Sequence, residues 1–299
     1  MHGKARDRWT AVLFLLPSVL AFVMVIVIPF FWGIYLSMTD WDGVRTNIQF
    51  TGWQNYSVIF KSPDFLYSFL ATTAFTVINV ILVNVVAFAL ALLVTGKIRG
   101  RNFYRAGFFV PNLIGGIVLG YIWQFLFNNV FPRVATILAV PALSTSLIAN
   151  ARLVILGVSI VNTWQYAGYI MMIYVAGIQS IPASLMEAAS TDGANYMTRL
   201  RKILIPMMAS SFTISLFLTL VNSFKQFDVN VSLTNGGPAT LFMMKAIKSS
   251  EFLALNIYNT AFTFSKLAQG QAKAVVFFVV LVVISLIQVW LNKRKEVEM

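Results

Sequence analysis

The sequence predicts an all-α membrane protein that crosses the bilayer six times. Hydrophobic residues make up 59% of the chain and charged residues only 11%, whereas soluble domains are roughly 25% charged. A helix needs roughly 20 apolar residues to cross the hydrocarbon layer, and such stretches recur along the whole chain. We therefore treat residues 1–299 as a single transmembrane domain and expect spans at 11–38, 67–95, 106–127, 153–177, 203–224 and 274–291.

All six windows lack Asp, Glu, Lys and Arg, and the last one is short but dense in Val, Phe, Leu and Ile. The stretch 134–151 is a seventh candidate, but Pro141 interrupts it and Ser144, Thr145 and Asn150 make it polar. An even number of spans places both termini on one side of the membrane. Because both termini are basic, six spans are favoured.

Lys and Arg are concentrated in the segments that we expect inside, at 1–10, 96–105, 178–202 and 292–299. Short cytoplasmic segments carry such an excess of positive charge. We therefore expect both termini in the cytoplasm. The net charge of +12 is explained by this flanking pattern, so it does not indicate nucleic-acid binding.

Residue usage excludes several kinds of chemistry. The chain has no cysteine, and its one histidine is His2, which argues against thiolate or histidine metal sites and against an integral membrane enzyme. An ion-coupled secondary transporter, the main alternative class, usually has ionisable residues within its spans, and the six windows have none. No Walker A pattern occurs, so any ATP must be hydrolysed by another polypeptide.

The inner segment 178–202 has the signals of two short helices. Ser184 and Glu187 fit a capping box at the start of the first helix, and Asp192-Gly193 is expected to end it. A second helix can run from Asn195 to Lys202, with basic residues in its last turn. Such a pair is either a docking device or a plain polar connector, and periodicity alone does not separate the two.

Motifs in and around this segment carry a family resemblance. Glu187-Ala188-Ala189, Asp192-Gly193-Ala194 and Ile203-Leu204-Ile205-Pro206 resemble, in order and spacing, the EAA loop of ATP-binding-cassette (ABC) importer permeases. The later Leu233-Thr234-Asn235-Gly236-Gly237-Pro238-Ala239 resembles the first permease of sugar-type importers, the maltose and glycerol-phosphate transporter relatives. The chain departs from the family at Leu200, where an aromatic residue is usual, and after Pro206, where a second proline is common.

The resemblance implies a type I ABC importer permease fold in a bacterial or archaeal cytoplasmic membrane. It implies no cofactor in this chain, with ATP and Mg bound by a cytoplasmic ABC ATPase dimer. A second, different permease subunit, an extracytoplasmic solute-binding protein and a sugar substrate are the other expected partners. The residues implied in ATPase coupling are Glu187, Ala188, Ala189, Asp192, Gly193, Arg199 and Lys202.

Polar side chains inside the fourth and fifth spans are candidates for sugar binding. Amide and hydroxyl groups can hydrogen-bond sugar hydroxyls, and aromatic rings can stack on sugar C–H faces. By likeness to the maltose-type relatives, the expected set is Gln165, Tyr166, Tyr169, Thr219, Asn222, Ser223 and Gln226. The alternative is that these groups join the helices by hydrogen bonds. We favour this helix-joining role for Asn79 and Asn84, which are five residues apart on the second span and so not on one face, and we assign them no further function.

Overall fold

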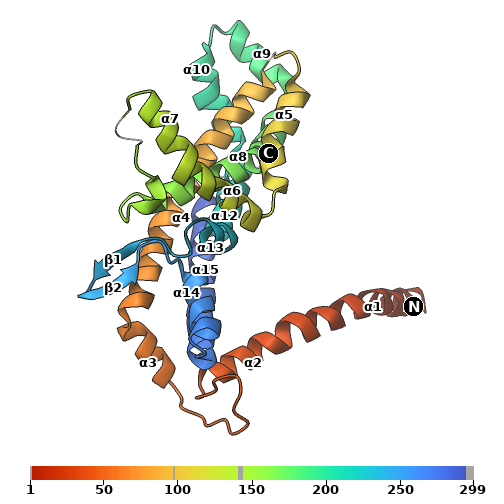
Figure 1. The fold of residues 1–299 in the computed structure, drawn as a ribbon. Helices are drawn as coiled ribbons and strands as arrows, with labels where there is room; N and C mark the ends of the chain where they lie inside the picture. Colours follow the sequence, from red (N-terminus) through yellow and green to blue (C-terminus); the bar gives the residue numbers. More distant parts are fainter. Residues whose placement is uncertain (1, 97, 141–143, 294–299) are drawn as a thin grey trace. The chain divides into compact units, whose positions relative to one another are not determined.

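A computed structural model describes residues 2–96, 98–140 and 144–293 of the chain (Figure 1). The chain forms two compact units: Met1–Lys61 with Ile257–Phe278, and Ser62–Asn256 with Val279–Met299. Three residues used in the sequence predictions lie outside the described residues. They are Arg294 and Lys295, which contribute to the expected inner charge, and Pro141 in the seventh candidate stretch.

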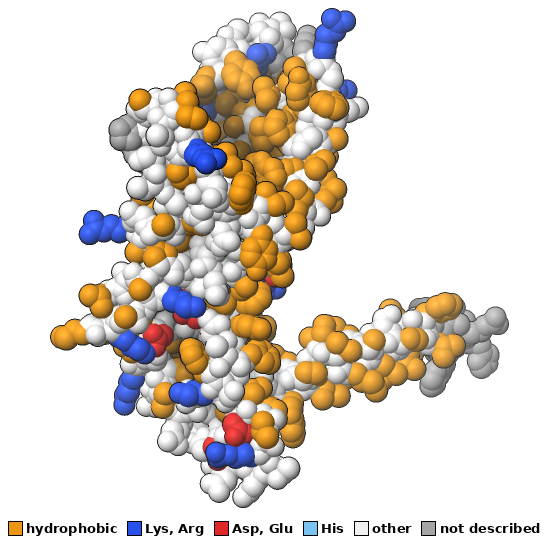
Figure 2. Space-filling model, in the orientation of Figure 1, with side chains coloured by type: hydrophobic (Ala, Val, Ile, Leu, Met, Phe, Trp, Pro, Cys, Tyr) orange, Lys and Arg blue, Asp and Glu red, His pale blue; other side chains and the backbone are white. Residues whose placement is uncertain are grey.

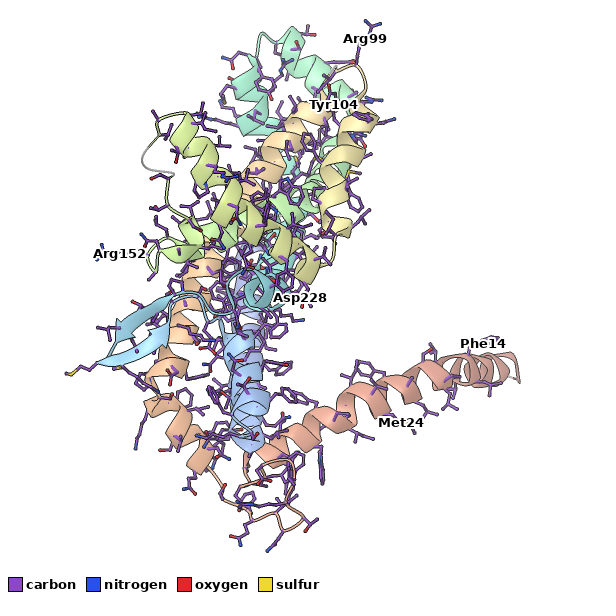
Figure 3. The ribbon with its side chains drawn as sticks, viewed as in Figure 1. Phe14, Met24, Arg99, Tyr104, Arg152 and Asp228 are labelled. Atoms are coloured by element: carbon purple, nitrogen blue, oxygen red, sulfur yellow. The ribbon has the colours of Figure 1, made fainter. Side chains whose placement is uncertain are left out.

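The first unit begins with a continuous helical rod made of α1 (His2–Phe22), the π-helical turn η1 (Val23–Val27) and α2 (Ile28–Ser37). Its side chains from Val12 onward are largely exposed, and Figure 3 labels Phe14 and Met24, which are 83% and 63% exposed. The stretch Val12–Ser37 is long and apolar enough to cross a membrane. Its exposed apolar surface is of the kind that a membrane-spanning helix presents.

The remainder of the first unit is held by specific contacts. In α3 (Gln54–Lys61), Asn55 Nδ2 donates to the carbonyls of Ser37 and Thr39, at 2.8 and 2.7 Å. These bonds attach the long loop after α2 to the end of that helix. The π-helical turn η7 (Asn259–Thr263) follows α14 (Leu253–Tyr258) and packs on the start of α15 (Leu267–Lys293), where Lys273 Nζ donates to Thr260 Oγ1 at 2.7 Å.

The second unit is built around α4 (Pro63–Thr95) and α8 (Val154–Ser180), which run side by side in the same direction. Small residues, among them the fully buried Ala87 and Ala91, let the two helices approach closely. Against this pair packs α12 (Ala209–Phe224). The other elements of the unit are α5 (Arg101–Phe109), η2 (Val110–Leu113), α6 (Gly116–Phe125), η3 (Leu126–Val130), α7 (Phe131–Ile137), η5 (Leu147–Ala149), α9 (Ala183–Thr191), α10 (Tyr196–Arg199), η6 (Leu200–Leu204), α11 (Ile205–Met207), α13 (Asp228–Thr234), β1 (Ala239–Phe242) and β2 (Lys245–Lys248).

Three π-helical turns share a local cause. The turns η1, η3 and η6 each end two residues before a proline, at Pro29, Pro132 and Pro206 respectively. Proline has no N–H to donate, and its ring clashes with the carbonyl four residues earlier. A π-helical turn accommodates both effects by inserting one residue, and so the helices continue through the proline instead of breaking.

Among the described residues, three helical stretches are individually long and apolar enough to cross a membrane: Val12–Ser37, Pro63–Thr95 and Leu267–Asn292. Three sharply bent helix pairs bring the number to six if each pair is one crossing. The structure therefore agrees with the expected all-α, six-span class. It has no long helix at 134–140 or 144–151, the described parts of the seventh candidate stretch.

The bends place span ends differently from the sequence windows. The window 106–127 contains a 96° bend between Arg101–Leu113 and Gly116–Ile137, at Ile114-Gly115, just after Pro111. The window 203–224 contains a 69° bend at Met208, so Tyr196–Met207 forms one helix before α12 begins. The last helix begins at Leu267 and therefore includes Lys273, only 6% exposed. The helix that contains the last predicted span thus also holds an ionisable group, one residue before the sequence window 274–291.

Candidate functional site

The turn between α9 and α10 is specified by its backbone hydrogen bonds. At the end of α9, the amides of Gly193 and Ala194 donate to the carbonyls of Ser190 and Ala189, at 3.1 and 2.9 Å. This is the Schellman pattern, which needs a left-handed residue, and Gly193 supplies it with a φ of +80°. Asn195 then caps α10, since its Oδ1 accepts the Thr198 amide at 2.8 Å.

The start of α9 corrects our capping-box prediction. The helix begins at Ala183 after Pro182, with no side-chain cap, so Ser184 lies inside the first turn and does not precede it. The cause is Pro182, because a proline disfavours helical geometry in the residue before it. Ile181 is accordingly extended and ends α8. Glu187 therefore makes no capping contact and remains exposed.

The charged side chains of this segment face solvent. Glu187, Asp192 and Lys202 are exposed, and within the described residues none of them makes an ion pair. Arg199 differs, since its side chain is half-buried and its Nε is buried without a hydrogen-bond partner. Figure 3 labels Arg99 and Tyr104 at the same end of the second unit as α9 and α10. This end combines exposed charge with exposed apolar groups such as Tyr196, at 59%.

The predicted sugar-binding residues lie in the interior of the second unit, where α8 and α12 meet α4. Gln165, Thr219, Ser223 and Gln226 are buried, and Tyr166, Tyr169 and Asn222 are half-buried. Three helices therefore contribute polar groups to one region that is otherwise apolar.

Asn79, to which we assigned no function, is central to this region. Its Nδ2 donates to Asn162 Oδ1 at 2.8 Å and to Ser223 Oγ at 2.7 Å, so it joins α4 to both neighbouring helices. Asn84 also faces them, since it donates to Thr219 Oγ1 at 3.3 Å and accepts from the Tyr174 hydroxyl at 2.7 Å. The helix-joining role that we favoured for both asparagines is confirmed, because α8 and α12 pack on adjacent sides of α4 and each asparagine reaches them.

Thr219 and Ser223 take part in this helix-joining network. Their hydroxyls donate to backbone carbonyls one turn earlier, at 2.7 and 2.6 Å, while they accept from Asn84 and Asn79. Both groups are thus satisfied without a ligand. The amides differ: Gln165 Oε1, Gln226 Nε2 and Asn79 Oδ1 are buried with no partner. Buried polar groups are normally satisfied, so these three atoms are exceptions within the region.

Tyr166, Thr219 and Asn222 line one crevice together with Asn79, Asn162 and Ile170, and it is too narrow to admit a water molecule. Tyr169 instead lines a separate apolar groove of about 700 Å³, between α5, α8 and α12. The groove is lined by Arg105, Ala106, Phe109, Tyr169, Met172, Ile173, Ala176, Ser211 and Ile214. The predicted set is therefore not gathered in one cavity: Tyr166, Thr219 and Asn222 line the crevice, Tyr169 lines the groove, and Gln165, Ser223 and Gln226 line neither.

Residues 98–297 match the family of binding-protein-dependent transport system inner membrane components. The chain belongs to this family. The permease is 44% identical, over 96% of its length and 95% of the relative's, to a probable starch degradation products transport system permease protein of Thermoanaerobacterium thermosulfurigenes. It is 28% identical, over 98% and 99%, to the multiple sugar-binding transport system permease protein of Streptococcus mutans.

The fold is that of a solved ABC importer permease. The chain matches a chain of a bacterial ABC transporter involved in the import of the acidic polysaccharide alginate. The TM-score is 0.79, with 18% sequence identity, and the match covers 97% of both chains. The same transporter in complex with an alginate pentasaccharide-bound periplasmic protein matches with a TM-score of 0.79 at 17% identity, over 97% and 96%. The protein is thus a membrane-embedded permease component of an ABC importer, and the alternative of an ion-coupled secondary transporter is not favoured.

Proposed function

We propose that this permease moves a neutral sugar or oligosaccharide across the cytoplasmic membrane, as the first of two different permease subunits. The observation that carries this proposal is the row of uncharged amide and hydroxyl groups on α8, on α12 and just after α12, in which Gln165 Oε1 and Gln226 Nε2 are buried without partners. The relatives' names, which refer to starch degradation products and to multiple sugars, point to the same substrate class.

The row suits a sugar on chemical grounds. Sugar hydroxyls both donate and accept, so they can satisfy an amide oxygen such as that of Gln165 and an amide nitrogen such as that of Gln226. Tyr166 provides an aromatic ring at the crevice, and Tyr169 provides one at the separate groove. We infer that the crevice is closed in the present state and opens when α8 and α12 separate during transport.

Energy for that separation comes, in this proposal, from ATP bound with Mg in a separate cytoplasmic ATPase dimer. The exposed pair α9 and α10 is the contact that we assign to the ATPase. Glu187, Asp192 and Lys202 have no ion-pair partner within the described residues, so their charges are available to another subunit. Both termini are then cytoplasmic, on the same side as this pair.

The substrate reaches the opposite side of the permease on an extracytoplasmic solute-binding protein. The family description names binding-protein dependence, and the alginate transporter with the same fold has been solved with such a protein bound. The sugar specificity then depends largely on the binding protein, while the permease row accepts whichever neutral sugar is released into it.

The sugar site is tested with the double variant Asn222→Leu and Gln226→Leu in reconstituted transporter. Each lost hydrogen bond weakens binding by about 1 kcal/mol or more, so sugar uptake is expected to fall by about tenfold or more. Uptake of a labelled maltodextrin, delivered by the binding protein, is the measurement.

Gln124→Leu is the matched control. Gln124 is also an amide on a helix of the second unit, but its Nε2 donates to the Leu233 carbonyl at 3.0 Å, outside the row. Uptake by this variant is expected to stay within about twofold of the parent. If the double variant transports as well as this control, the sugar site is not on α12.

Partner composition is tested by mild extraction with a C-terminal tag, followed by mass spectrometry of what remains bound. A second permease and an ATPase with a Walker A motif are expected, and the ATPase is expected to be lost when Glu187 and Gly193 are both substituted. Recovery of this chain alone under every mild condition would contradict the proposed subunit composition.

A further inference from the structure

The β1–β2 hairpin has an unusual turn. The two antiparallel strands pair Phe242 with Lys245, so Met243 and Met244 form a two-residue turn. Both methionines have positive φ, at +49° and +60°. Turns of this kind strongly prefer Asn-Gly, because side chains other than Asn and Gly are strained there. A local preference for the turn therefore does not explain why methionines stand at this position.

One face of the hairpin is fixed to the beginning of α4. The Phe242 ring packs on Tyr67 with 5.4 Å between centroids, and the Tyr67 hydroxyl donates to the Ser249 carbonyl at 3.1 Å. Lys245 forms an ion pair with Asp64. These contacts hold the base of the hairpin at the first turns of α4, the end of the second unit opposite α9 and α10 (Figure 1).

The tip and the other face of the hairpin are apolar and uncovered. Met244 is fully exposed, at 102%, Leu241 is 77% exposed and Met243 is 65% exposed. The charged groups nearby are already occupied, since Lys245 pairs with Asp64 and Lys248 Nζ donates to the Asn235 carbonyl at 3.0 Å. Figure 2 shows hydrophobic side chains at the free end of this projection.

The position along α4 identifies what the tip meets. The helix has 33 residues, more than the roughly 20 that cross the hydrocarbon layer, so its ends lie near the headgroups. Leu70, one turn beyond Tyr67, is 54% exposed and begins a row of exposed apolar side chains that continues with Val77, Ile81 and Val85. The hairpin thus stands beside the start of the lipid-facing row and projects sideways from it.

We propose that the β1–β2 hairpin is an interfacial membrane anchor whose tip, formed by Leu241, Met243 and Met244, inserts into the lipid layer beside α4. Flexible methionine side chains adapt to a fluid environment, and burial of the tip in lipid offsets the strain of the turn. Lipid is favoured over a protein partner because the hairpin stands beside the exposed apolar row of α4 that begins at Leu70.

The chain has no cysteine, so a single introduced thiol in this subunit reports on one place. The assembled transporter, with native cysteines of its other subunits replaced, is prepared with Met244→Cys, labelled with a fluorophore and placed in lipid nanodiscs. Quenching by nitroxide-bearing lipids is compared with quenching by aqueous iodide. Leu70→Cys serves as the lipid reference and the exposed loop variant Asn47→Cys as the aqueous reference.

The Met244 probe is expected to be quenched by the nitroxide lipids several-fold more strongly than the Asn47 probe, and to be largely protected from iodide. Quenching by iodide alone would overturn the proposal. So would protection that appears only when the solute-binding protein is added, because that result assigns the tip to a protein contact.

A second experiment separates the apolar tip from hairpin folding. Replacing Met243-Met244 with Asn-Gly supplies the sequence that the turn prefers, so the hairpin is retained while its apolar tip is removed. A probe at Leu241→Cys is expected to lose several-fold of its lipid quenching in this background, with no decrease in the melting temperature of the complex. Unchanged lipid quenching at this probe would contradict a role for the methionines in membrane contact.

Discussion

Gly193 provides a direct test of the proposed coupling segment. Its φ of +80° lies in the left-handed region, yet an added Cβ there would meet no atom within 4 Å. The cost of substitution is therefore a backbone cost alone. It is about 1–2 kcal/mol for an ordinary residue, smaller for Asn, which tolerates this conformation, and largest for a β-branched residue. We expect Gly193→Asn to be nearly neutral, Gly193→Ala to cost about 1 kcal/mol and Gly193→Val about 2 kcal/mol.

A penalty of about 2 kcal/mol reduces the population of the native bend by roughly 30-fold. The assay is sugar uptake per ATP hydrolysed in proteoliposomes, and this ratio is expected to fall in the order Asn, Ala, Val. Gly115→Val is the control, since Gly115 also has open space around it but has a φ of −59° that any residue adopts. If the Gly193→Val transporter remains as tightly coupled as the Asn variant, the bend does not transmit the ATPase signal.

Three further predictions concern stability. Asn79→Leu removes two interhelical hydrogen bonds, each worth about 0.6–1.7 kcal/mol in a membrane protein. The complex is therefore expected to denature at a clearly lower temperature. An unchanged transition would mean that water replaces the amide. Gly168→Ala places a Cβ 1.8 Å from the Phe108 carbonyl oxygen, and overpacking of this kind costs about 1–3 kcal/mol, which the same assay detects. The backbone N–H groups of Arg45 and Val44 hold the pKa of Asp42 below its usual value. The ionised carboxylate therefore stabilises this loop above about pH 4, and the contribution is lost as the pH falls through the folded pKa. Amide exchange at Val44 is expected to accelerate in that pH range, and exchange without such acceleration would refute the assignment.

The sequence predicted the all-α, membrane-spanning class, because a bilayer imposes length and composition on every span. It also predicted the α9–α10 turn, since Gly193 and Asn195 act through local backbone geometry. Polarity inside an apolar span also predicted that Asn79 and Asn84 join helices, but it could not identify their partners. Their spacing of five residues separates them around α4, and only the placement of α8 and α12 on adjacent sides shows that both reach one network.

Helix ends were also difficult to predict for a physical reason. Lys273 looked like the boundary of the last span because a charged residue normally ends an apolar window. In the structure it lies inside α15 and donates to Thr260 of the neighbouring turn, a tertiary contact with no local signal. The bend at Met208 follows Pro206 by two residues, and proline often bends helices, but the window 203–224 was placed on apolar composition alone.

The uninterrupted course of α8 has a mechanical consequence. The helix rises about 1.5 Å per residue, so Tyr166 lies about 18 Å and Ser180 about 39 Å from Val154. If α8 turns as a lever around its Val154 end, a tilt of about 5° moves Ser180 by about 3.4 Å but Tyr166 by only about 1.6 Å. In such a rotation, a displacement of Ser180 at the α9 end produces about half that displacement at the crevice, with roughly twofold greater force.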